Sequence, residues 1–378
     1  MIHVHTRTWD ESLGWSKPSQ QLQKEPQLVF IFGDTEHIEA EKLYAEAREL
    51  YPQSHIIIAT NAGTIFGKEL TENTLSLTAL YFEKTRIWYA ETTIGSPNES
   101  REIGARLAKF LPTHELRHAF VVSEGLGVNG SELVAGINAN LPSTVAVTGA
   151  LAADGLRSEK TYVGLNAVPK RNTIGLIGFY GNHIHVSYTS KTGWRPTSEK
   201  YRITRSEGNI LYEMDNRPAL DVFTEIMGPE LAAQLPISGG AFPLEVQQKD
   251  GSKVIRTIVG LNKDDNSFIF AGDIPTDTDA YIMTSTNEEL IENARLAAKS
   301  AMEKLGMPPQ FALPVSCYGR KAFMKDKTQL EIEALAKELG ATPTFGFYTN
   351  GELAPTEDSG VNCKWHNQTM TITLFAED

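Results

Sequence analysis

The sequence predicts an α+β fold in which mixed β-sheets, flanked by helices, are divided between two domains. The chain has 378 residues, a length that suits two or three domains with sizeable cores. Both halves alternate apolar, strand-like runs with segments of helical periodicity. The longest apolar runs, such as TIGLIGFYG, are much shorter than the roughly 20 residues that span a bilayer. We therefore expect no membrane insertion.

Composition narrows the class of protein further. There are 35 Lys and Arg against 47 Asp and Glu, which gives a net charge of −12. Such a surface repels polyphosphate, and no block of basic residues offsets it, so we expect no nucleic-acid partner. Only two cysteines occur, Cys317 and Cys363, and the N-terminus lacks the apolar segment of a signal peptide. These features favour a cytoplasmic protein.

The first half begins with a polar arm, 1–26, followed by a domain over 27–217. Leu28 to Asp34 reads as a buried strand, 35–51 as an amphipathic helix and His55 to Thr60 as the next strand. Two further helices carry N-terminal signals, Ser96 with Glu99 and Asn129 with Glu132. Strands are predicted around 118–124 and 143–149, and hairpins from 173 to 213.

The second domain, 218–378, opens with a helix near 218–227. Strands follow, and then a long helix over 287–306 with acidic residues early and Lys304 late, as the helix dipole favours. A helix at 328–340 and further strands complete the chain.

A glycine turn, Gly125-x-Gly127-x-x-Gly130, lies between a strand and a helix, and Asp154 follows 24 residues after Gly130. This is the pattern of a dinucleotide-binding loop, whose glycines allow close approach to a pyrophosphate. The helix is short, however, and the turn comes after a complete βαβ unit that lacks the motif. A glycine-rich turn without a ligand is the other interpretation.

Several residues are candidates for metal or nucleophile chemistry. His183 and His185 share one face of a predicted strand, where they would form a metal or haem edge or simply a polar surface. Cys317 ends a strand near Arg320, an environment that can activate a thiol, with His366 as its base. A small buried cysteine is the alternative.

The C-terminal stretch is rich in polar side chains. Thr349-Asn350-Gly351-Glu352 forms a turn, and His366-Asn367-Gln368-Thr369 heads an apolar strand. These residues offer more donors and acceptors than a turn requires. They line a ligand site or form a buried network that joins two strands.

At these residues the sequence resembles the FIST family. The resemblance rests on Ser316-Cys317-x-Gly319-Arg320, on Gly346-x-Tyr348-x-x-Gly351-Glu352 and on 366–369, with Gly127-x-Asn129-Gly130 in the first half. It covers roughly 28–375. In this family the glycine turn belongs to the fold and implies no dinucleotide.

The resemblance implies a sensory protein that binds a small, amino-acid-like ligand and regulates a separate partner, such as a histidine kinase or a cyclic-dinucleotide signalling protein. It implies no catalytic residue. The ligand would lie near the cleft between the halves. The expected ligand-binding residues are Arg320, Tyr348, Asn350, Glu352, His366, Asn367, Cys317 and Arg256. The alternatives are an enzyme with Cys317 as nucleophile and a dinucleotide-binding oxidoreductase.

A stand-alone protein of this length is also similar to the NosP group of nitric-oxide-sensing haemoproteins. That similarity implies non-covalent haem b, because the chain has no C-x-x-C-H motif. His366 would be the iron ligand, with His183 or His185 as second choices. Arg320 and Arg256 would meet the propionates.

Overall fold

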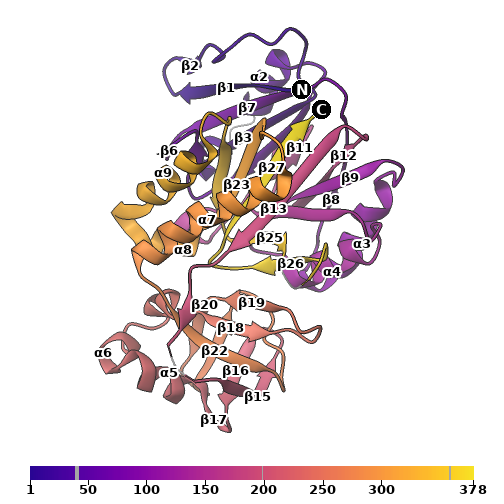
Figure 1. The fold of residues 1–378 in the computed structure, drawn as a ribbon. Helices are drawn as coiled ribbons and strands as arrows, with labels where there is room; N and C mark the ends of the chain where they lie inside the picture. Colours follow the sequence, from indigo (N-terminus) through magenta and orange to yellow (C-terminus); the bar gives the residue numbers. More distant parts are fainter. Residues whose placement is uncertain (39–41, 198, 357–358) are drawn as a thin grey trace.

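The structure, a computed structural model, describes residues 1–38, 42–197, 199–356 and 359–378. It confirms the α+β prediction. Three six-stranded sheets form a large body, and a nine-stranded sheet forms a small body below it in Figure 1. The two chain ends lie close together at the top of this view, where the Met1 amino group is 3.0 Å from a Glu377 carboxylate oxygen.

The three sheets of the large body share one plan. The strand orders are β11-β4-β3-β7-β1-β2, β26-β25-β10-β9-β12-β8 and β6-β5-β24-β23-β27-β13. The first sheet contains β1 (Ile2–Asp10), β2 (Gly14–Trp15), β3 (Leu28–Gly33), β4 (His55–Thr60), β7 (Leu75–Phe82) and β11 (Val163–Leu165). The second contains β8 (Arg86–Thr93), β9 (Leu116–Ser123), β10 (Ala146–Leu151), β12 (Thr173–Tyr180), β25 (Gly351–Pro355) and β26 (Cys363–His366). The third contains β5 (Thr64–Phe66), β6 (Glu69–Thr71), β13 (Ile184–Lys191), β23 (Phe311–Cys317), β24 (Phe345–Thr349) and β27 (Met370–Glu377).

Each sheet is built around one parallel pair: β3 with β4, β9 with β10, and β23 with β24. An antiparallel strand, β7, β12 or β27, follows on one side of the pair. On the other side lies a strand that comes from a neighbouring unit. The strand after β4 (β5) joins the third sheet, the strand after β24 (β25) joins the second, and the strand after β10 (β11) joins the first. The large body is thus a cyclic, pseudo-threefold assembly of three interlocked units.

Residues 1–26, expected to form an arm, contribute β1 and β2 to the first sheet. β1 pairs with β7 from Ile2 to Thr8, and Ile2 and Val4 are buried. The alternation of apolar and polar residues in "IHVHT" is therefore a strand signal, with one face packed on the core.

Helices cover the outer faces of the three sheets. They are α1 (Thr35–Ile38), α2 (Lys42–Leu50), α3 (Ser100–Phe110), α4 (Gly130–Asn138), α7 (Asn287–Leu305), α8 (Tyr318–Met324) and α9 (Thr328–Leu339). α1 and α2 lie within the helix predicted over 35–51, whose residues 39–41 are outside the described residues. Asn129 caps α4, as predicted, by accepting the Glu132 N–H at 3.1 Å.

The inner faces of the sheets meet in one apolar core. Aromatic side chains from all three sheets form it, among them Phe30, Phe120, Phe179, Phe345 and Phe375. Separate apolar clusters lie between each sheet and its helices. The large body therefore has a shared centre and three outer layers, an arrangement that buries both faces of each parallel pair.

The small body spans 195–284. Its strands are β14 (Arg195–Pro196), β15 (Tyr201–Glu207), β16 (Ile210–Met214), β17 (Arg217–Pro218), β18 (Leu244–Gln247), β19 (Lys253–Arg256), β20 (Ile258–Asn262), β21 (Ser267–Phe270) and β22 (Asp279–Thr284). Its helices are α5 (Ala219–Met227) and α6 (Pro229–Ala232). A short 3-10 turn, η3 (Ile237–Ala241), also belongs to the small body. The large body contains the 3-10 turns η1 (Pro97–Glu99), η2 (Gly155–Arg157) and η4 (Lys325–Lys327). The two bodies therefore do not coincide with the two domains predicted from the sequence, because the small body takes strands from both sides of residue 217.

Candidate functional site

The three parallel strand pairs end at one place, where backbone hydrogen bonds close a ring. The bonds run from Ala62 N to Tyr348 O (2.9 Å), from Asn350 N to Leu151 O (3.1 Å) and from Ala153 N to Thr60 O (3.2 Å). In each unit the donor follows the acceptor by two residues, so the ring repeats the pseudo-threefold plan of the sheets. Ligands of α/β proteins bind outside the carboxyl ends of parallel strands. Cys317, Arg320, Tyr348, Asn350 and Glu352 all follow or end such strands here.

Arg320, in the first turn of α8, is fully buried and paired with Glu331 of α9. Its Nε donates to Glu331 Oε1 at 2.8 Å, and its remaining N–H groups contact that carboxylate and three backbone carbonyls. A guanidinium has five N–H donors, and all five are used. Arg320 therefore has no donor left for a ligand carboxylate or a haem propionate.

Tyr348 belongs to the same buried network. Its hydroxyl donates to Glu331 Oε2 at 2.9 Å, and Ser316 Oγ donates to the same oxygen at 3.2 Å. Burial, together with the neighbouring Glu331 carboxylate, raises the pKa of Tyr348 well above its usual value. The phenol is neutral and faces protein on all sides. By contrast, the Asn350 side chain is partly exposed at the edge of the ring.

Glu352 is a second buried carboxyl group, on β25. It accepts hydrogen bonds from Thr369 N (3.1 Å), Thr369 Oγ1 (2.7 Å) and Thr349 Oγ1 (3.1 Å). Burial raises the pKa of Glu352 to about 8, and these hydrogen bonds oppose the shift. The carboxyl group is thus close to titration near neutral pH, although no solvent reaches it.

Cys317 does not have the environment of a nucleophile. The side chain is buried, and burial together with the nearby Glu352 carboxyl raises the pKa of the thiol. Its sulfur has no hydrogen bond to an imidazole within the described part of the chain. The geometry matches the small buried cysteine that the sequence left open as the alternative.

The histidines do not form a haem site. His366 Nε2 lies 3.0 Å from the carbonyl oxygen of Ala354 within the β25–β26 hairpin, and burial lowers the pKa of the ring to about 4. His183 and His185 lie at the surface and bond Asp378 at 2.7 and 3.2 Å. An axial ligand must present a free imidazole nitrogen to an apolar slot. His366, the first choice of ligand, donates its Nε2–H to the Ala354 carbonyl within its own hairpin, and His183 and His185 bond Asp378 at the surface, so these residues do not fit haem.

The segment 366–369 joins the two bodies. Asn367 Oδ1 accepts the N–H of Thr257, and Gln368 Nε2 donates to the carbonyl of Gly240 at 3.1 Å. On the other side, the Thr369 backbone and hydroxyl donate to Glu352. Gln368 has a φ of 61°, a left-handed conformation that is uncommon for residues other than glycine. The polar stretch that looked like a ligand site is therefore a link between the bodies.

Arg256 of β19 strengthens this link. It donates to the carbonyl of Trp365 at 2.8 Å and to Ser131 Oγ at 3.2 Å, and its guanidinium lies 5.5 Å from the centre of the Trp365 ring. Burial lowers the pKa of Arg256 to about 10, but the side chain stays charged at neutral pH. Asn129 adds a hydrogen bond to Asp273 at 3.2 Å. Arg256 thus binds protein across the junction.

The glycine turn carries its own anion. The carboxylate of Glu124 accepts the N–H groups of Leu126 and Gly127 and the hydroxyl of Thr161. These are the amides that a pyrophosphate would need. A side chain on Gly125 would overlap the carbonyl oxygen of Ala152. The glycines therefore permit close packing, and no phosphate fits over the turn as it stands.

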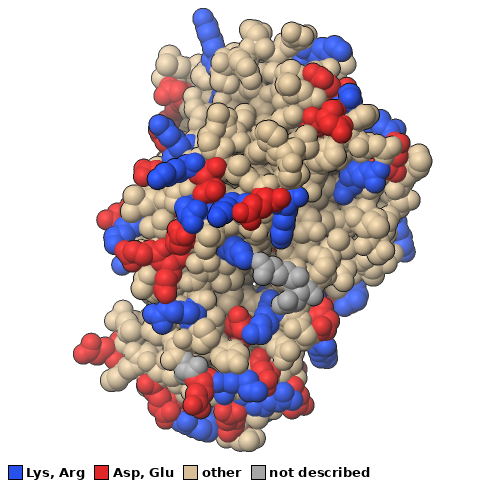
Figure 2. Space-filling view, viewed as in Figure 1, with Lys and Arg blue, Asp and Glu red and all other residues tan. Residues whose placement is uncertain are grey.

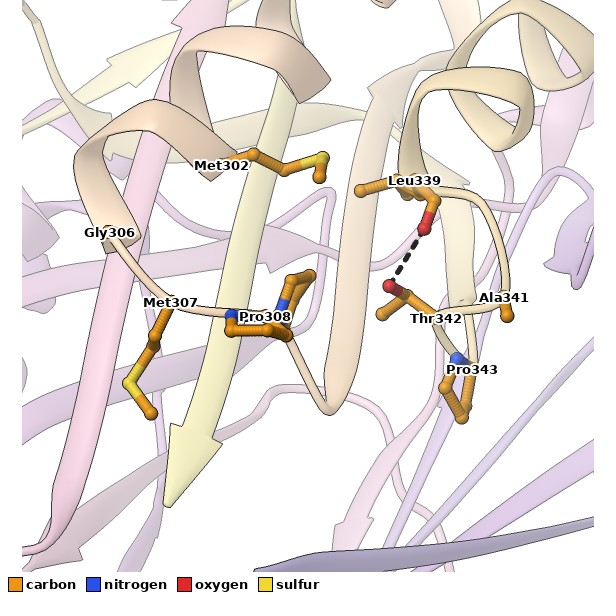
Figure 3. Close-up of a pocket in the computed structure, with 9 residues that line it drawn as sticks. Met302, Gly306, Met307, Pro308, Leu339, Ala341, Thr342 and Pro343 are labelled. Atoms are coloured by element: carbon orange, nitrogen blue, oxygen red, sulfur yellow. Dashed lines mark hydrogen bonds between the residues drawn. The ribbon is translucent and has the colours of Figure 1, made fainter. Parts of the chain in front are cut away.

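Among the described residues, two of the cavities lie on the large body and are lined by none of the residues above. One of them, about 620 Å³, is an apolar groove between the ends of α7 and α9, lined also by Met307 and Pro308, where Met302 and Leu339 point toward each other (Figure 3). The smaller, about 310 Å³, lies against β13. Figure 2 shows acidic and basic side chains interspersed on one face of the molecule, without a basic patch.

Comparison with known proteins places the chain in a family. Residues 27–217 match the FIST N domain, and residues 219–355 match the FIST C domain. Together these matches cover most of the chain, which belongs to the FIST family. FIST domains are associated with sensory signalling.

Individual relatives add little on activity. An uncharacterized protein of Mycobacterium tuberculosis (strain H37Rv) is 25% identical over 253 residues, which is 65% of this chain and 64% of the relative. An uncharacterized protein of Mycobacterium bovis is 25% identical over 251 residues, 64% of this chain and 63% of its own. The chain thus matches slightly less than two thirds of these relatives.

Among solved structures, a cyanuric acid hydrolase from A. caulinodans aligns with 93% of this chain and 90% of its own, with 7% identity and a TM-score of 0.39. A similarity this weak carries no inference about activity. No helix in the described ranges is long and apolar enough to cross a membrane.

Sequence reasoning missed Glu331 and Glu124. Glu331 lies on the face of α9 that also buries Ile332 and Leu335, so a carboxylate occupies part of an apolar stripe. An acid in that place is a detectable signal, because a buried charge requires a partner. Glu124 directly precedes the glycine turn, and its position gave no comparable indication.

Proposed function

We propose that this protein is a sensory signal-transduction module that binds a small molecule and passes a change in the large body to the small body. The link would be the segment 366–369. The observation that carries the proposal is the double attachment of this segment. Glu352 of the large body holds Thr369, while Asn367 and Gln368 hold the small body.

The hydrogen bonds of the link support the transmission of a change from the large body to the small body, which we call the relay. A change in the position or protonation of Glu352 alters the acceptor that holds Thr369, and the two preceding residues carry the contacts to Thr257 and Gly240. Trp194, which leads into the small body, donates its indole N–H to Gln368 O at 3.1 Å. One of the two places where the chain crosses between the bodies thus contacts the link at Gln368. Coupling between distant parts of a protein is carried by packed contacts that can adopt two discrete arrangements.

Binding rather than catalysis is part of the proposal. The buried thiol of Cys317 and the fully engaged Arg320 argue against an enzyme built on them. The ligand we expect is amino-acid-like, and the partner is a separate signalling protein, such as a histidine kinase or a cyclic-dinucleotide signalling protein. No step of the proposal uses haem.

Hydrogen–deuterium exchange on a Glu352→Gln variant tests the relay without a known ligand. The amide keeps the shape of the side chain but changes the bonds to Thr369. We therefore expect altered exchange in η3 and β19 of the small body, which are far from β25 in the sequence. The matched control is Glu91→Gln, which changes an exposed carboxyl that accepts the Leu165 N–H at 2.7 Å. That control should affect only the large body.

An effect of Glu352→Gln that stays within the large body would reject the relay. So would equal effects of both variants on the small body, because they would reflect general destabilisation. Mass spectrometry of peptic peptides from 237–241 and 253–256 provides the readout.

A further inference from the structure

The outer edge of β1 is covered by a strap, residues 11–20, that follows the strand directly. β1 pairs with β7 from Ile2 to Thr8, whereas β2 pairs only with Trp9 and Asp10. Backbone groups of the even-numbered residues of β1 therefore point away from β7 and toward the strap. In Figure 1, β1 and β2 lie at the end of the large body opposite the small body.

The strap imitates a paired strand by using side chains. Ser16 donates its backbone N–H to the Thr8 carbonyl at 2.8 Å and accepts the Thr8 N–H with its hydroxyl at 3.0 Å. Ser19 makes the same two bonds with Thr6, at 3.0 and 2.9 Å. A regular antiparallel strand would accept both N–H groups with backbone carbonyls and would advance two residues between the bonds. The strap advances three residues, with Pro18 among them, so it satisfies the edge without forming a ladder.

Few contacts hold the strap down. No residue from 11 to 25 is buried, and Leu13, at the tip of the turn between β1 and β2, is 86% exposed. Trp15 of the strap packs against the apolar cluster between the first sheet and its helices. Segments with exposed hydrogen bonds and little buried apolar surface open at a small cost in free energy. The strap can therefore leave the edge while the rest of the sheet stays folded.

The edge beneath the strap carries a cation without a carboxylate. Arg7 donates its Nε–H to the Tyr51 hydroxyl at 2.9 Å and an Nη1–H to the carbonyl of Ser16 in the strap. It pairs with no acid in the described part of the chain, although the protein as a whole is acidic. Because Nη1 already reaches the strap, a carboxylate on a strand in the same place would replace the Ser16 carbonyl as a stronger, charge-assisted acceptor.

We propose that residues 11–20 are a displaceable strap, and that the β1 edge beneath it accepts an extended segment of a partner protein with an acidic residue opposite Arg7. The segment would join the first sheet as a further strand, with its backbone on Thr6 and Thr8 and its carboxylate on Arg7. This docking site goes beyond the relay and does not depend on it. The rival explanation is a fixed cover that protects the edge from aggregation.

Hydrogen–deuterium exchange resolved to single residues separates the two explanations. The amides of Thr6 and Thr8 face the strap, and those of His5 and Arg7 face β7. After correction for intrinsic rates, we expect Thr6 and Thr8 to exchange at least tenfold faster than His5 and Arg7 in the unbound protein. Equal rates would show that the edge opens only when the sheet unfolds, and would overturn the displaceable strap.

Two labelled synthetic peptides test the partner: Thr-Val-Glu-Val-Thr-Val, and the same peptide with Lys in place of Glu. The Ser16→Ala/Ser19→Ala double variant removes both hydroxyl acceptors, so we expect it to bind the Glu peptide at least fivefold more tightly than the wild type. Ser12→Ala is the matched control, because this exposed hydroxyl bonds Asp10 within the turn. In the double variant the Glu peptide should bind at least threefold more tightly than the Lys peptide, and adding Arg7→Met should abolish this preference.

Failure of the double variant to bind the Glu peptide would overturn the docking site. A preference for Glu that persists with Arg7→Met would overturn the acidic residue opposite Arg7. Light scattering covers the remaining occupant: if the double variant dimerises without peptide, the edge pairs with a second copy of the chain and the acidic partner falls.

Discussion

At the scale of single residues, the most informative groups are buried charges. Arg320 and Glu331 form an ion pair with both side chains fully buried. Removing one member of such a pair leaves an uncompensated charge, which typically costs 3–5 kcal/mol. The extra bonds from Arg320 to backbone carbonyls tie α8 to α7 and to residues 192 and 368. The residue predicted to hold a ligand thus holds four segments of chain together.

Glu352 makes stability depend on pH. Its pKa is raised to about 8 by burial, against 4.5 in the unfolded chain, so the folded state holds a proton that the unfolded state loses. This contribution is fully present below pH 4.5 and is lost as pH rises through about 8. We expect the free energy of unfolding of the wild type to fall between about pH 4.5 and 8 relative to Glu352→Gln, and to change little with pH above that range.

Urea titrations at several pH values measure this difference, which one protonation step limits to about 1.4 kcal/mol per pH unit. Parallel pH profiles for the two proteins would show that Glu352 does not titrate in this range.

At the scale of elements, close packing depends on glycines. A β-carbon on Gly130, the first residue of α4, would lie 2.5–2.9 Å from atoms of the Trp365 ring. Trp365 cannot move freely, because Arg256 bonds its carbonyl and covers its ring. The fit of α4 against β26 therefore requires glycine at this position.

Gly130→Ala should lower the free energy of unfolding by about 1–3 kcal/mol, the usual cost of overpacking. Gly240→Ala is the matched control, since a β-carbon there meets nothing within 4 Å. Chemical denaturation followed by tryptophan fluorescence compares the two. Equal stability of both variants would show that α4 shifts without cost.

Local signals predicted many elements but not their assembly. The first βαβ unit, the Asn129 cap and the long helix α7 follow from residues close in sequence. The predicted capping box at Ser96 differs: Ser96 caps a 3-10 turn, and Glu99 accepts from Gly95 instead. The exchanged strands β5, β11 and β25 could not be predicted, because a three- to five-residue strand carries no information about which distant strand it joins.

The candidate site shows the same limit. The motifs at 316–320, 348–352 and 366–369 do converge in space, as their polar character suggested. Whether a polar cluster faces a ligand or its own protein depends on partners such as Glu331, whose place on α9 only the tertiary fold supplies. The cavity at β13 is defined by chain segments more than 50 residues apart, which no local pattern brings together.

At the scale of the whole molecule, Arg256 couples the two bodies. Arg256→Met would leave the buried carbonyl of Trp365 without its donor, at a cost of about 1–3 kcal/mol. We expect the small body to loosen from the large one, so that proteases cut faster in the crossings near 192–197 and 284–287. Arg205→Met, an exposed arginine over Tyr212 in the same body, is the control.

Fragment patterns under limited proteolysis report this change directly. If Arg256→Met and Arg205→Met give the same cleavage rates at both crossings, Arg256 does not hold the bodies together.

The exchange of β5, β11 and β25 among the three units has a consequence for how the chain is made. The first unit emerges from the ribosome with a vacant place beside β4, which β11 fills only about 100 residues later. The second waits longer still for β25, near the C-terminus. Nascent chains therefore expose open sheet edges until β25 has been made, and in crowded cells two copies could lend strands to each other instead of to themselves.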